Sequence, residues 1–432
     1  MRTMAQDTAQ PEDRWLISVD DHIIEPPHTW ERWLPRKLRD EGPRFVRDEL
    51  GEAWIYGGRR APVQQLTAAA GKDRDEFSPF AIDMSEMREG CYDPTARAKD
   101  MDRNRVLASV VFPTFAGLCG NTFYEGPDLA LGLECIRAYN DFLLQEWCAT
   151  QPGRFVPIIL VPLWDMAAAV REVERCIPLG AKAIGFSENP SRVFRMVGGV
   201  EQPLPSIHDA GGYWDPLFAI ANEAGLPLCI HIASTTRPLF TSPDAPIHTS
   251  GCVSRFVGPQ SLTFDWLFSG HFQRFPNLRI LMSEGGIGWI PSALDQADYQ
   301  FRHHNAWLRK IGDFDVSQQG GFSVPTQGVM ETKVNRNDLW GDDELPSTVF
   351  RRHMFGCFFK DDFGCRHLDE VGFDNAMVEV DYPHSDSTWP NSLPMALEAL
   401  SGWSREIQDK VLFGNAQRLF NLDLPDPAGL RR

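Results

Sequence analysis

The stretch WLISVDDHIIEPPHTW, residues 15–30, places groups that could bind a metal directly after an apolar run. Asp20 and His22 stand two residues apart, so in an extended strand their side chains point to the same face. A buried carboxylate without a partner costs several kcal/mol, roughly, and a divalent metal removes that cost. We therefore expect Asp20 and His22 to bind a metal and Asp21 to point away. Glu25 fits a structural role as well as a catalytic one.

Further polar residues follow other apolar runs of the chain. If these runs are strands of one parallel barrel, the residues at their carboxyl ends meet at one mouth. They are Ser187 and Glu188 after the fourth run, His231 after the fifth, Glu284 after the sixth, Lys360 and Asp361 after the seventh, and Asp381 and His384 after the eighth. Their joint occurrence favours a metal site that takes mixed His and carboxylate ligands, such as zinc, iron or manganese.

Each of these residues also has a structural interpretation when it is taken alone. An Asp-x-His pair at a strand end is common without a metal, and His231 could be a core histidine bonded to a backbone carbonyl. Asp381 could cap the turn in DYPHSD, because Asp before Pro and Ser is ordinary turn chemistry. A hydrolytic triad of His384, Ser385 and Asp386 is disfavoured, since adjacent loop residues rarely align in that way.

The elements that must position these groups are eight strands alternating with amphipathic helices. The apolar runs begin at residue 15 and continue at 106–114, 155–163, 181–189, 226–234, 278–286, 353–362 and 375–386. Continuous apolar strands indicate a parallel sheet buried on both faces, and eight such units predict an α/β fold of the closed (β/α)8 TIM-barrel type. The alternative is an open doubly wound sheet, but the Gly-rich first turn typical of that fold is missing.

The chain reads as one domain with two insertions. Residues 44–58 alternate around a turn, which predicts a hairpin within an insertion at about 27–90. A second insertion is predicted at about 310–352, between the sixth and seventh units. We expect residues 1–14 to be disordered or extended, 15–425 to form the barrel domain, and 426–432 to be a tail.

Composition excludes several classes of partner. The formal net charge of −17 disfavours nucleic acid and anionic membranes, and no long uncharged apolar stretch is present. Nine scattered cysteines without a C-x-x-C pair are typical of reduced, buried thiols. The expected location is the cytoplasm. A homodimer is compatible with these features.

Several motifs together resemble the amidohydrolase superfamily. They are DDHIIEPP, the His of LCIHIAS, EGGIGWIP, DYPH and VLFGNAQRLFNL, and the resemblance covers residues 15–30 and 92–422. The most similar branch is amidohydrolase-2, typified by aminocarboxymuconate-semialdehyde decarboxylase. The resemblance implies a barrel with Asp20 and His22 as first-strand ligands and His231 as the fifth-strand ligand. Asp381 would be both the eighth-strand ligand and a proton shuttle.

One position departs from the decarboxylases of this branch, which carry a histidine where this chain has Glu284. A carboxylate is a poorer proton donor near neutral pH, but it is a good second-metal ligand or general base. With Glu188 as a bridging group, these residues would form a two-metal site. We therefore expect one or two divalent transition metals per chain.

These features favour a metal-dependent hydrolase. Metal-bound water, deprotonated by Asp381, would attack an ester, amide or thioester bond of a bulky, largely apolar small molecule, with Glu284 and His384 also catalytic. Arg237, Trp289 and Trp389 are expected to contact the substrate, although Arg237 could equally pair with a surface acid. The alternatives are a non-oxidative decarboxylase of an aromatic or dienoic acid, in which His384 or another group donates the proton, and an inactive binding barrel.

Overall fold

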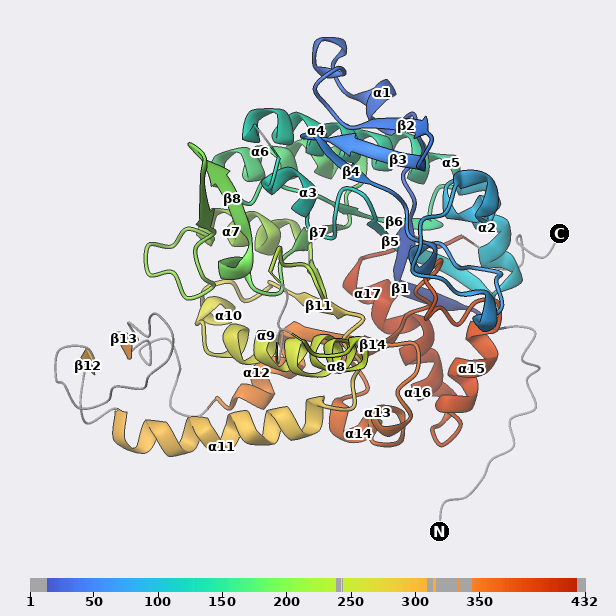
Figure 1. The fold of residues 1–432 in the computed structure, drawn as a ribbon. Coiled ribbons are helices and arrows are strands. Elements are labelled where there is room, and N and C mark those ends of the chain that lie inside the picture. Colours follow the sequence, from blue (N-terminus) through green and yellow to red (C-terminus); the bar gives the residue numbers. More distant parts are fainter. Residues whose placement is uncertain are drawn as a thin grey trace.

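Eight parallel strands form one sheet that closes on itself in the computed structural model, which describes residues 14–126, 128–237, 242, 244–308, 314–315, 333–334 and 344–425. The order of pairing is β1-β5-β6-β7-β10-β11-β14-β15. The strands are β1 Leu16–Ile23, β5 Val106–Pro113, β6 Phe155–Ile159, β7 Ala183–Phe186, β10 Leu228–His231, β11 Ile280–Ser283, β14 Met354–Phe358 and β15 Ala376–Val378. Beyond β15, the Asp381 amide donates to the Asp20 carbonyl over 2.8 Å and joins the last strand to the first. This ring confirms the predicted (β/α)8 barrel (Figure 1).

The barrel strands are buried on both faces. All eight residues of β5 are buried, and Ala108, Val110 and Phe112 pack inside the barrel with residues of the other strands. The outward-facing Val111 packs in a second core beneath the helices. Burial on both sides explains why the strands appear in the sequence as uninterrupted apolar runs.

The helices begin and end at residue types that favour those positions. The main ones are α2 Pro94–Arg103, α4 Leu129–Phe142, α6 Met166–Cys176, α7 Asp215–Ala224, α9 Gly258–Leu267, α11 Ile290–Leu308, α12 Pro346–His353, α15 Ser392–Ala399, α16 Arg405–Asp409 and α17 Asn415–Leu419. The Asp93 side chain caps α2 by accepting a hydrogen bond from the Ala96 amide. Helix α7 ends at Gly225, whose φ of 65° is the left-handed conformation that glycine adopts without strain.

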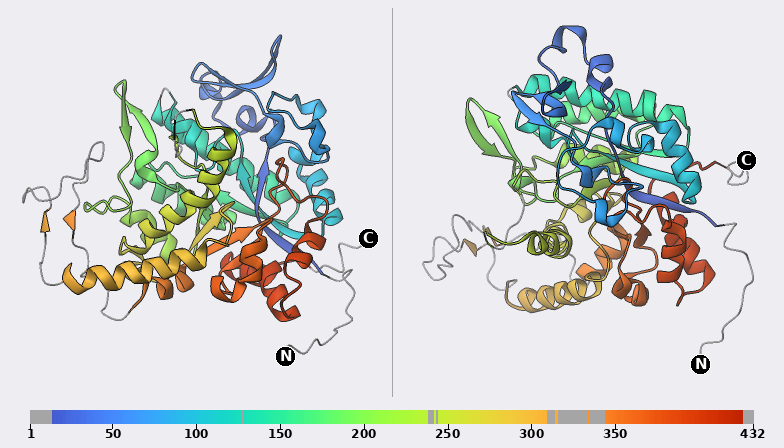
Figure 2. Two further views of the ribbon diagram at one scale, coloured as in Figure 1. Left: turned by 60° about the horizontal axis from the view of Figure 1, so that its bottom comes forward. Right: turned by 45° about the vertical axis from the view of Figure 1, so that its right-hand side comes forward.

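The first insertion carries a three-stranded antiparallel sheet, which confirms the predicted hairpin and adds one strand. Its strands are β2 Arg44–Asp48, β3 Gly51–Tyr56 and β4 Arg59–Ala61. The sheet projects on the side of the barrel opposite helices α15 to α17 (Figures 1 and 2). Farther along the chain, the Ala69 and Ala70 amides donate to the Pro383 carbonyl over 2.8 and 3.0 Å. The insertion is therefore hydrogen-bonded to the loop that follows β15.

The second insertion ends earlier than the sequence predicts. Most of 310–352 lies outside the described residues, as do 1–13 and 426–432. Helix α12 starts at Pro346, within the predicted insertion, and buries Val349 and Phe350. The barrel therefore resumes before residue 352. An antiparallel pair after β7, β8 Phe194–Val197 with β9 Val200–Pro203, is a feature that the sequence analysis did not predict.

In the described part of the chain, no helix combines the length and the apolar character that a membrane crossing requires.

Two buried histidines outside the barrel mouth make the stability of the fold depend on pH. His271 Nε2 and His353 Nδ1 each lie 2.8 Å from a backbone carbonyl, and burial lowers the pKa of both to about 4. Below the unfolded-state pKa of about 6.5, the unfolded chain takes up protons that the folded chain does not. We expect stability to fall between pH 6.5 and pH 4, by at most about 1.4 kcal/mol per pH unit for each histidine.

Chemical denaturation of wild type and His353→Gln between pH 7 and pH 4 measures this effect. In His353→Gln, the slope of the free energy of unfolding against pH should fall by the contribution of about one proton. His303→Gln, at an exposed position, should keep the wild-type slope. Equal slopes for His353→Gln and wild type would exclude a neutral buried His353.

Candidate metal centre

The register of β1 changes where its polar residues begin. Its pairing with β5 shifts between Ser18 and Asp21, an irregularity of the bulge type. Asp20 and His22 carry their side chains into the barrel mouth. Asp21 points away, as predicted, and accepts hydrogen bonds from Ser18 Oγ at 3.0 Å and from the Tyr382 amide at 2.9 Å. Asp20 and His22 thus share one site. Asp21 instead connects the first barrel strand with the segment that follows the last one.

The four ligands that the family resemblance implies, Asp20, His22, His231 and Asp381, converge from three strands or strand ends. His22 Nε2 lies 3.5 Å from Asp20 Oδ1 and 3.5 Å from Asp381 Oδ1. His231 Nε2 lies 3.3 Å from Asp20 Oδ2. All four residues are buried, with at most 4% of their surface exposed. The barrel therefore gathers two carboxylates and two imidazoles in one small volume.

The atoms that face this volume have no hydrogen-bond partner among the described residues. They include both carboxylate oxygens of Asp20 and the Nε2 atoms of His22 and His231. Burial raises the pKa of Asp20 well above its usual range, and the charge of Glu379 adds to this effect. Burial also lowers the pKa of both histidines, which favours their neutral form. Carboxylate oxygens and neutral imidazole nitrogens that face one another suit a divalent cation, so the residues present fit the metal that the sequence predicts.

Backbone contacts orient the imidazoles for this purpose. His231 Nδ1 lies 2.6 Å from the Ile232 carbonyl, so this nitrogen carries the proton and Nε2 presents its lone pair. His22 hydrogen-bonds the backbone of Pro113 at the end of β5. A hydrogen bond from the second ring nitrogen to a carbonyl is the usual arrangement of a metal-binding histidine.

His384 lies at the outer edge of the same centre. Its Nδ1 is 2.8 Å from Asp381 Oδ1, and its ring stacks on that of His22 with the centroids 3.9 Å apart. Burial raises the pKa of Asp381 to about 7, although the charge and hydrogen bond of His384 act against this rise. Burial alone would lower the pKa of His384, but the charge of Asp381 raises it overall. The His384 side chain is 19% exposed and that of Asp381 is 1% exposed, so His384 connects the buried carboxylate with the barrel mouth.

Glu284 reaches the centre but is held by an arginine that the sequence analysis missed. Its Oε2 lies 3.4 Å from His231 Nε2, and its Oε1 is ion-paired with Arg255 Nη2. The same guanidinium nitrogen lies 2.5 Å from Asp386 Oδ2. The Glu284 backbone has a φ of 59°, and its amide donates to Glu379 Oε2 over 3.0 Å. Arg255 lies in the π-helical turn Val253–Val257, away from any strand end, so the barrel rule gives no signal for it.

Glu188 is not placed with the other predicted ligands. Among the described residues, two groups have ligand atoms close enough to hold a metal, namely Asp20, His22 and His231, and His22, Asp381 and His384. The two groups share His22 and thus describe a single centre. Glu188 is in neither group, and its backbone amide donates to Ser234 Oγ over 2.8 Å. The geometry gives no support to a second metal bridged by Glu188.

The three predicted substrate contacts are engaged elsewhere. Arg237 is ion-paired with Glu201, and both side chains are about half exposed. Trp289 is 4% exposed and donates to the Gly285 carbonyl over 2.9 Å. Trp389 donates to a backbone carbonyl of α2 over 3.1 Å. Their roles as substrate contacts stay predictions, because these partners do not show whether a substrate also reaches them.

A family profile described as amidohydrolase matches residues 76–422. The chain belongs to this family. The match covers most of the barrel and confirms the resemblance seen in the sequence, while the antiparallel sheet of the first insertion lies before the matched residues.

Relatives of this chain include decarboxylases. Gamma-resorcylate decarboxylase of Polaromonas is 29% identical over 319 residues, which cover 67% of this chain and 77% of the relative. Gamma-resorcylate decarboxylase of Rhodococcus jostii is 30% identical over 233 residues, covering 48% of this chain and 62% of the relative.

Solved structures share the fold. An amidohydrolase from Mycobacterium avium subsp. paratuberculosis superposes with a TM-score of 0.67 at 19% identity, covering 94% of this chain and 99% of that one. A dihydroxybenzoic acid decarboxylase from Polaromonas, solved with manganese and the inhibitor 2-nitroresorcinol, has a TM-score of 0.55 at 17% identity, covering 96% and 98%.

These comparisons overturn the main functional expectation from the sequence. Hydrolysis of an ester, amide or thioester is wrong as the leading interpretation, and the alternative of a non-oxidative decarboxylase is better supported. The physical reason lies at Glu284, which we interpreted as a second-metal ligand or general base. One of its oxygens is ion-paired with Arg255, so this carboxylate is not a free base.

Proposed function

We propose that this protein is a metal-dependent decarboxylase that removes the carboxylate of an aromatic acid without oxidising it. The observation that carries the proposal is the similarity to gamma-resorcylate decarboxylase across 77% of that relative. The buried centre of two carboxylates and two neutral imidazoles is consistent with it. We propose an aromatic acid with an oxygen substituent next to the carboxylate.

Asp20, His22, His231 and Asp381 would hold the metal, because their side chains converge and most of the facing atoms lack partners. A bound divalent cation supplies a Lewis acid for the substrate carboxylate and the neighbouring ring oxygen. Manganese is our proposed metal, since the dihydroxybenzoic acid decarboxylase structure contains it.

The chain's own residues would supply the proton that replaces the carboxylate. His384 is partly exposed and its Nδ1 lies 2.8 Å from Asp381 Oδ1, so it can pass a proton from solvent to that buried carboxylate. Asp381 then protonates the ring carbon that bears the carboxylate. The bond between the ring and the carboxylate breaks, its electron pair returns to the ring, and carbon dioxide leaves.

Arg255 would assist the approach of an anionic substrate. The formal net charge of the chain is −17, which repels carboxylates at long range. Arg255 is 37% exposed at the mouth, next to Glu284 and Asp386, and offsets part of this repulsion close to the centre.

The proposal is tested with the full-length protein, stripped of metal and reloaded with manganese. It is incubated with 2,6-dihydroxybenzoate, 5-carboxyvanillate and benzoate, and both carbon dioxide and the ring product are measured. We expect turnover of at least one hydroxylated acid, none of benzoate, and loss of turnover when a chelator is added. Absence of carbon dioxide release from both hydroxylated acids would contradict the proposal.

A further inference from the structure

The carboxylate of Glu284 lies beside the metal centre, and the proposed reaction gives it no role. Its Oε2 lies 3.4 Å from His231 Nε2, the nitrogen that presents its lone pair to the centre. The other carboxylate oxygen, Oε1, is ion-paired with Arg255. One oxygen of Glu284 is therefore occupied, and the other lies next to the place where a molecule bound at the centre would be.

The backbone holds Glu284 in this position. Its φ of 59° is in the left-handed region, which residues with a side chain seldom adopt. The Glu284 amide donates to Glu379 Oε2 over 3.0 Å, and Glu379 is buried. A conformation of this kind persists only where the surrounding contacts impose it, and such residues cluster in functional sites. The Glu284 side chain thus starts from a fixed point of the barrel.

Arg255 holds the same carboxylate from the side of the mouth. Its Nη2 contacts Glu284 Oε1 and lies 2.5 Å from Asp386 Oδ2. The Glu284 side chain is 10% exposed and that of Asp386 is 50% exposed, so only Asp386 is well solvated. His231 Nε2 makes no hydrogen bond within the described ranges, so the 3.4 Å contact leaves Glu284 Oε2 without a donor.

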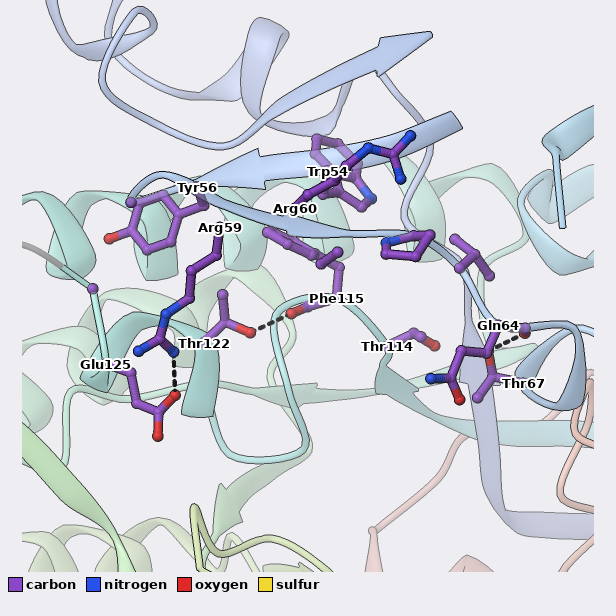
Figure 3. A pocket seen from close by; sticks show the side chains of 15 residues that line it. Trp54, Tyr56, Arg59, Arg60, Gln64, Thr67, Thr114, Phe115, Thr122 and Glu125 are labelled. Carbon is purple, nitrogen blue, oxygen red and sulfur yellow. Dashed lines mark hydrogen bonds and ion pairs between the residues drawn. The ribbon is translucent and has the colours of Figure 1, made fainter. Parts of the chain in front are cut away.

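A second pair of arginine and glutamate shows how an ordinary surface pair differs. Arg59 and Glu125 line a cavity of about 410 Å³ between β3 and the loop after β5 (Figure 3). Their side chains are 70% and 40% exposed, so water solvates the carboxylate of Glu125. An exposed pair of this kind contributes little. The Glu284 carboxylate is mostly shielded from water, so a donor on a bound molecule would matter more to it.

The chemistry of Glu284 Oε2 decides what it can recognise. As the partner of Arg255, Glu284 is a carboxylate, which accepts hydrogen bonds and donates none. A hydroxyl group would donate to Oε2, and hydrogen bonds to a charged acceptor are roughly twice as strong as those between neutral groups. An ether oxygen has no hydrogen to donate, so its lone pairs would face those of Oε2. The carboxylate of a substrate would be repelled as a like charge.

We infer that Glu284 determines specificity, because it selects an aromatic acid with a free hydroxyl group beside its carboxylate over the same acid with an ether at that position. The inference rests on the proposed decarboxylase function for the kind of substrate and on the geometry of Glu284 for the selection. The hydroxyl group of the substrate would lie toward Glu284 Oε2, and its carboxylate would lie away from it.

The test compares the binding of two acids that differ by one methyl group, 2-hydroxybenzoate and 2-methoxybenzoate. Their Kd values are measured by isothermal titration calorimetry with the full-length protein loaded with manganese. Glu284→Gln keeps the shape of the side chain, and its amide can donate to an ether oxygen. Asp386→Asn is the matched control, because it neutralises the other acid on the Arg255 guanidinium.

We expect wild type to bind 2-hydroxybenzoate at least tenfold more tightly than 2-methoxybenzoate. Glu284→Gln should lower this ratio of Kd values at least tenfold, because the amide no longer repels the ether. Asp386→Asn should keep the ratio within about twofold of wild type, since the exposed Asp386 contacts neither acid. The methyl group and the metal affect the two acids equally in wild type and variant, so the change of ratio isolates Glu284.

Manganese affinity is measured on the same samples, because a role of Glu284 as a further metal ligand is the competing explanation. We expect Glu284→Gln to change the Kd for manganese less than tenfold. A loss of tenfold or more would make Glu284 a metal ligand and overturn the inference. Equal binding of the two acids to wild type would overturn it without any variant, and so would a wild-type ratio in Glu284→Gln.

The outcomes separate this inference from the proposed function. If no hydroxylated acid is decarboxylated but the ratio falls in Glu284→Gln, the proposed reaction fails and the selection by Glu284 stands. If carbon dioxide is released but Glu284→Gln keeps the wild-type ratio, the reaction stands and the selection by Glu284 fails.

Discussion

Asp381→Asn should lower kcat for decarboxylation by roughly 10²–10⁴-fold, the range that a positioned proton donor contributes. The substitution preserves the shape of the side chain but removes the proton that the ring carbon would receive. It also weakens one metal ligand, so metal content must be measured by plasma mass spectrometry on the same sample. If Asp381 donates the proton, kcat of Asp381→Asn should be low even in protein that is fully reloaded with metal.

Asp386→Asn is the matched control, because it makes the same substitution in the same loop. The Asp386 side chain is 50% exposed and contacts Arg255 rather than the proposed ligands. An exposed ion pair contributes little, so kcat should change by less than about fivefold. If Asp381→Asn kept wild-type kcat, another group would have to donate the proton.

Metal binding should have a large effect on stability as well as on activity. In the chelated protein, Asp20 and the two histidines face one another without partners, and a metal that binds only the folded state stabilises it. Manganese at 100 times its Kd should raise the free energy of unfolding by about 2.7 kcal/mol, measured as a shift of the thermal transition. His231→Ala should lose this shift and weaken metal binding by more than about tenfold.

His303→Ala serves as the comparison, since it removes an exposed imidazole of α11 that is not one of the proposed ligands. This variant should show the same metal-dependent shift of the thermal transition as wild type. A wild-type transition that does not respond to manganese, zinc or iron would contradict the assignment of Asp20, His22, His231 and Asp381 as ligands.

The grouping of the residues at the strand ends was predictable, because the carboxyl ends of all strands in a closed parallel barrel meet at one mouth. Asp20, His22, His231 and Asp381 follow apolar runs, and parallel strands bring such positions together whatever their separation in sequence. The prediction did not require knowledge of the register shift in β1 that places Asp20 beside His22. Alternation alone indicated that these two side chains share a face.

The loop residues were not predictable in the same way. Arg255 meets Glu284 because the π-helical turn Val253–Val257 folds over the end of β11, and no sequence period marks this contact. The sequence therefore led us to interpret Glu284 as a second-metal ligand or general base, and it did not show the ion pair with Arg255. The hairpin was visible in the sequence, whereas the third strand beside it, Arg59–Ala61, was not. A homodimer and a cytoplasmic location stay predictions.

The joining of β15 to β1 has a consequence for the biosynthesis of the enzyme. The hydrogen bond from the Asp381 amide to the Asp20 carbonyl forms only when these distant parts of the chain have met. A nascent chain that has exposed β1 carries Asp20 and His22 without His231 and Asp381, which come later in the sequence. The proposed metal site is therefore complete only after the last barrel strand has docked, so metal binding would report on completion of the whole fold.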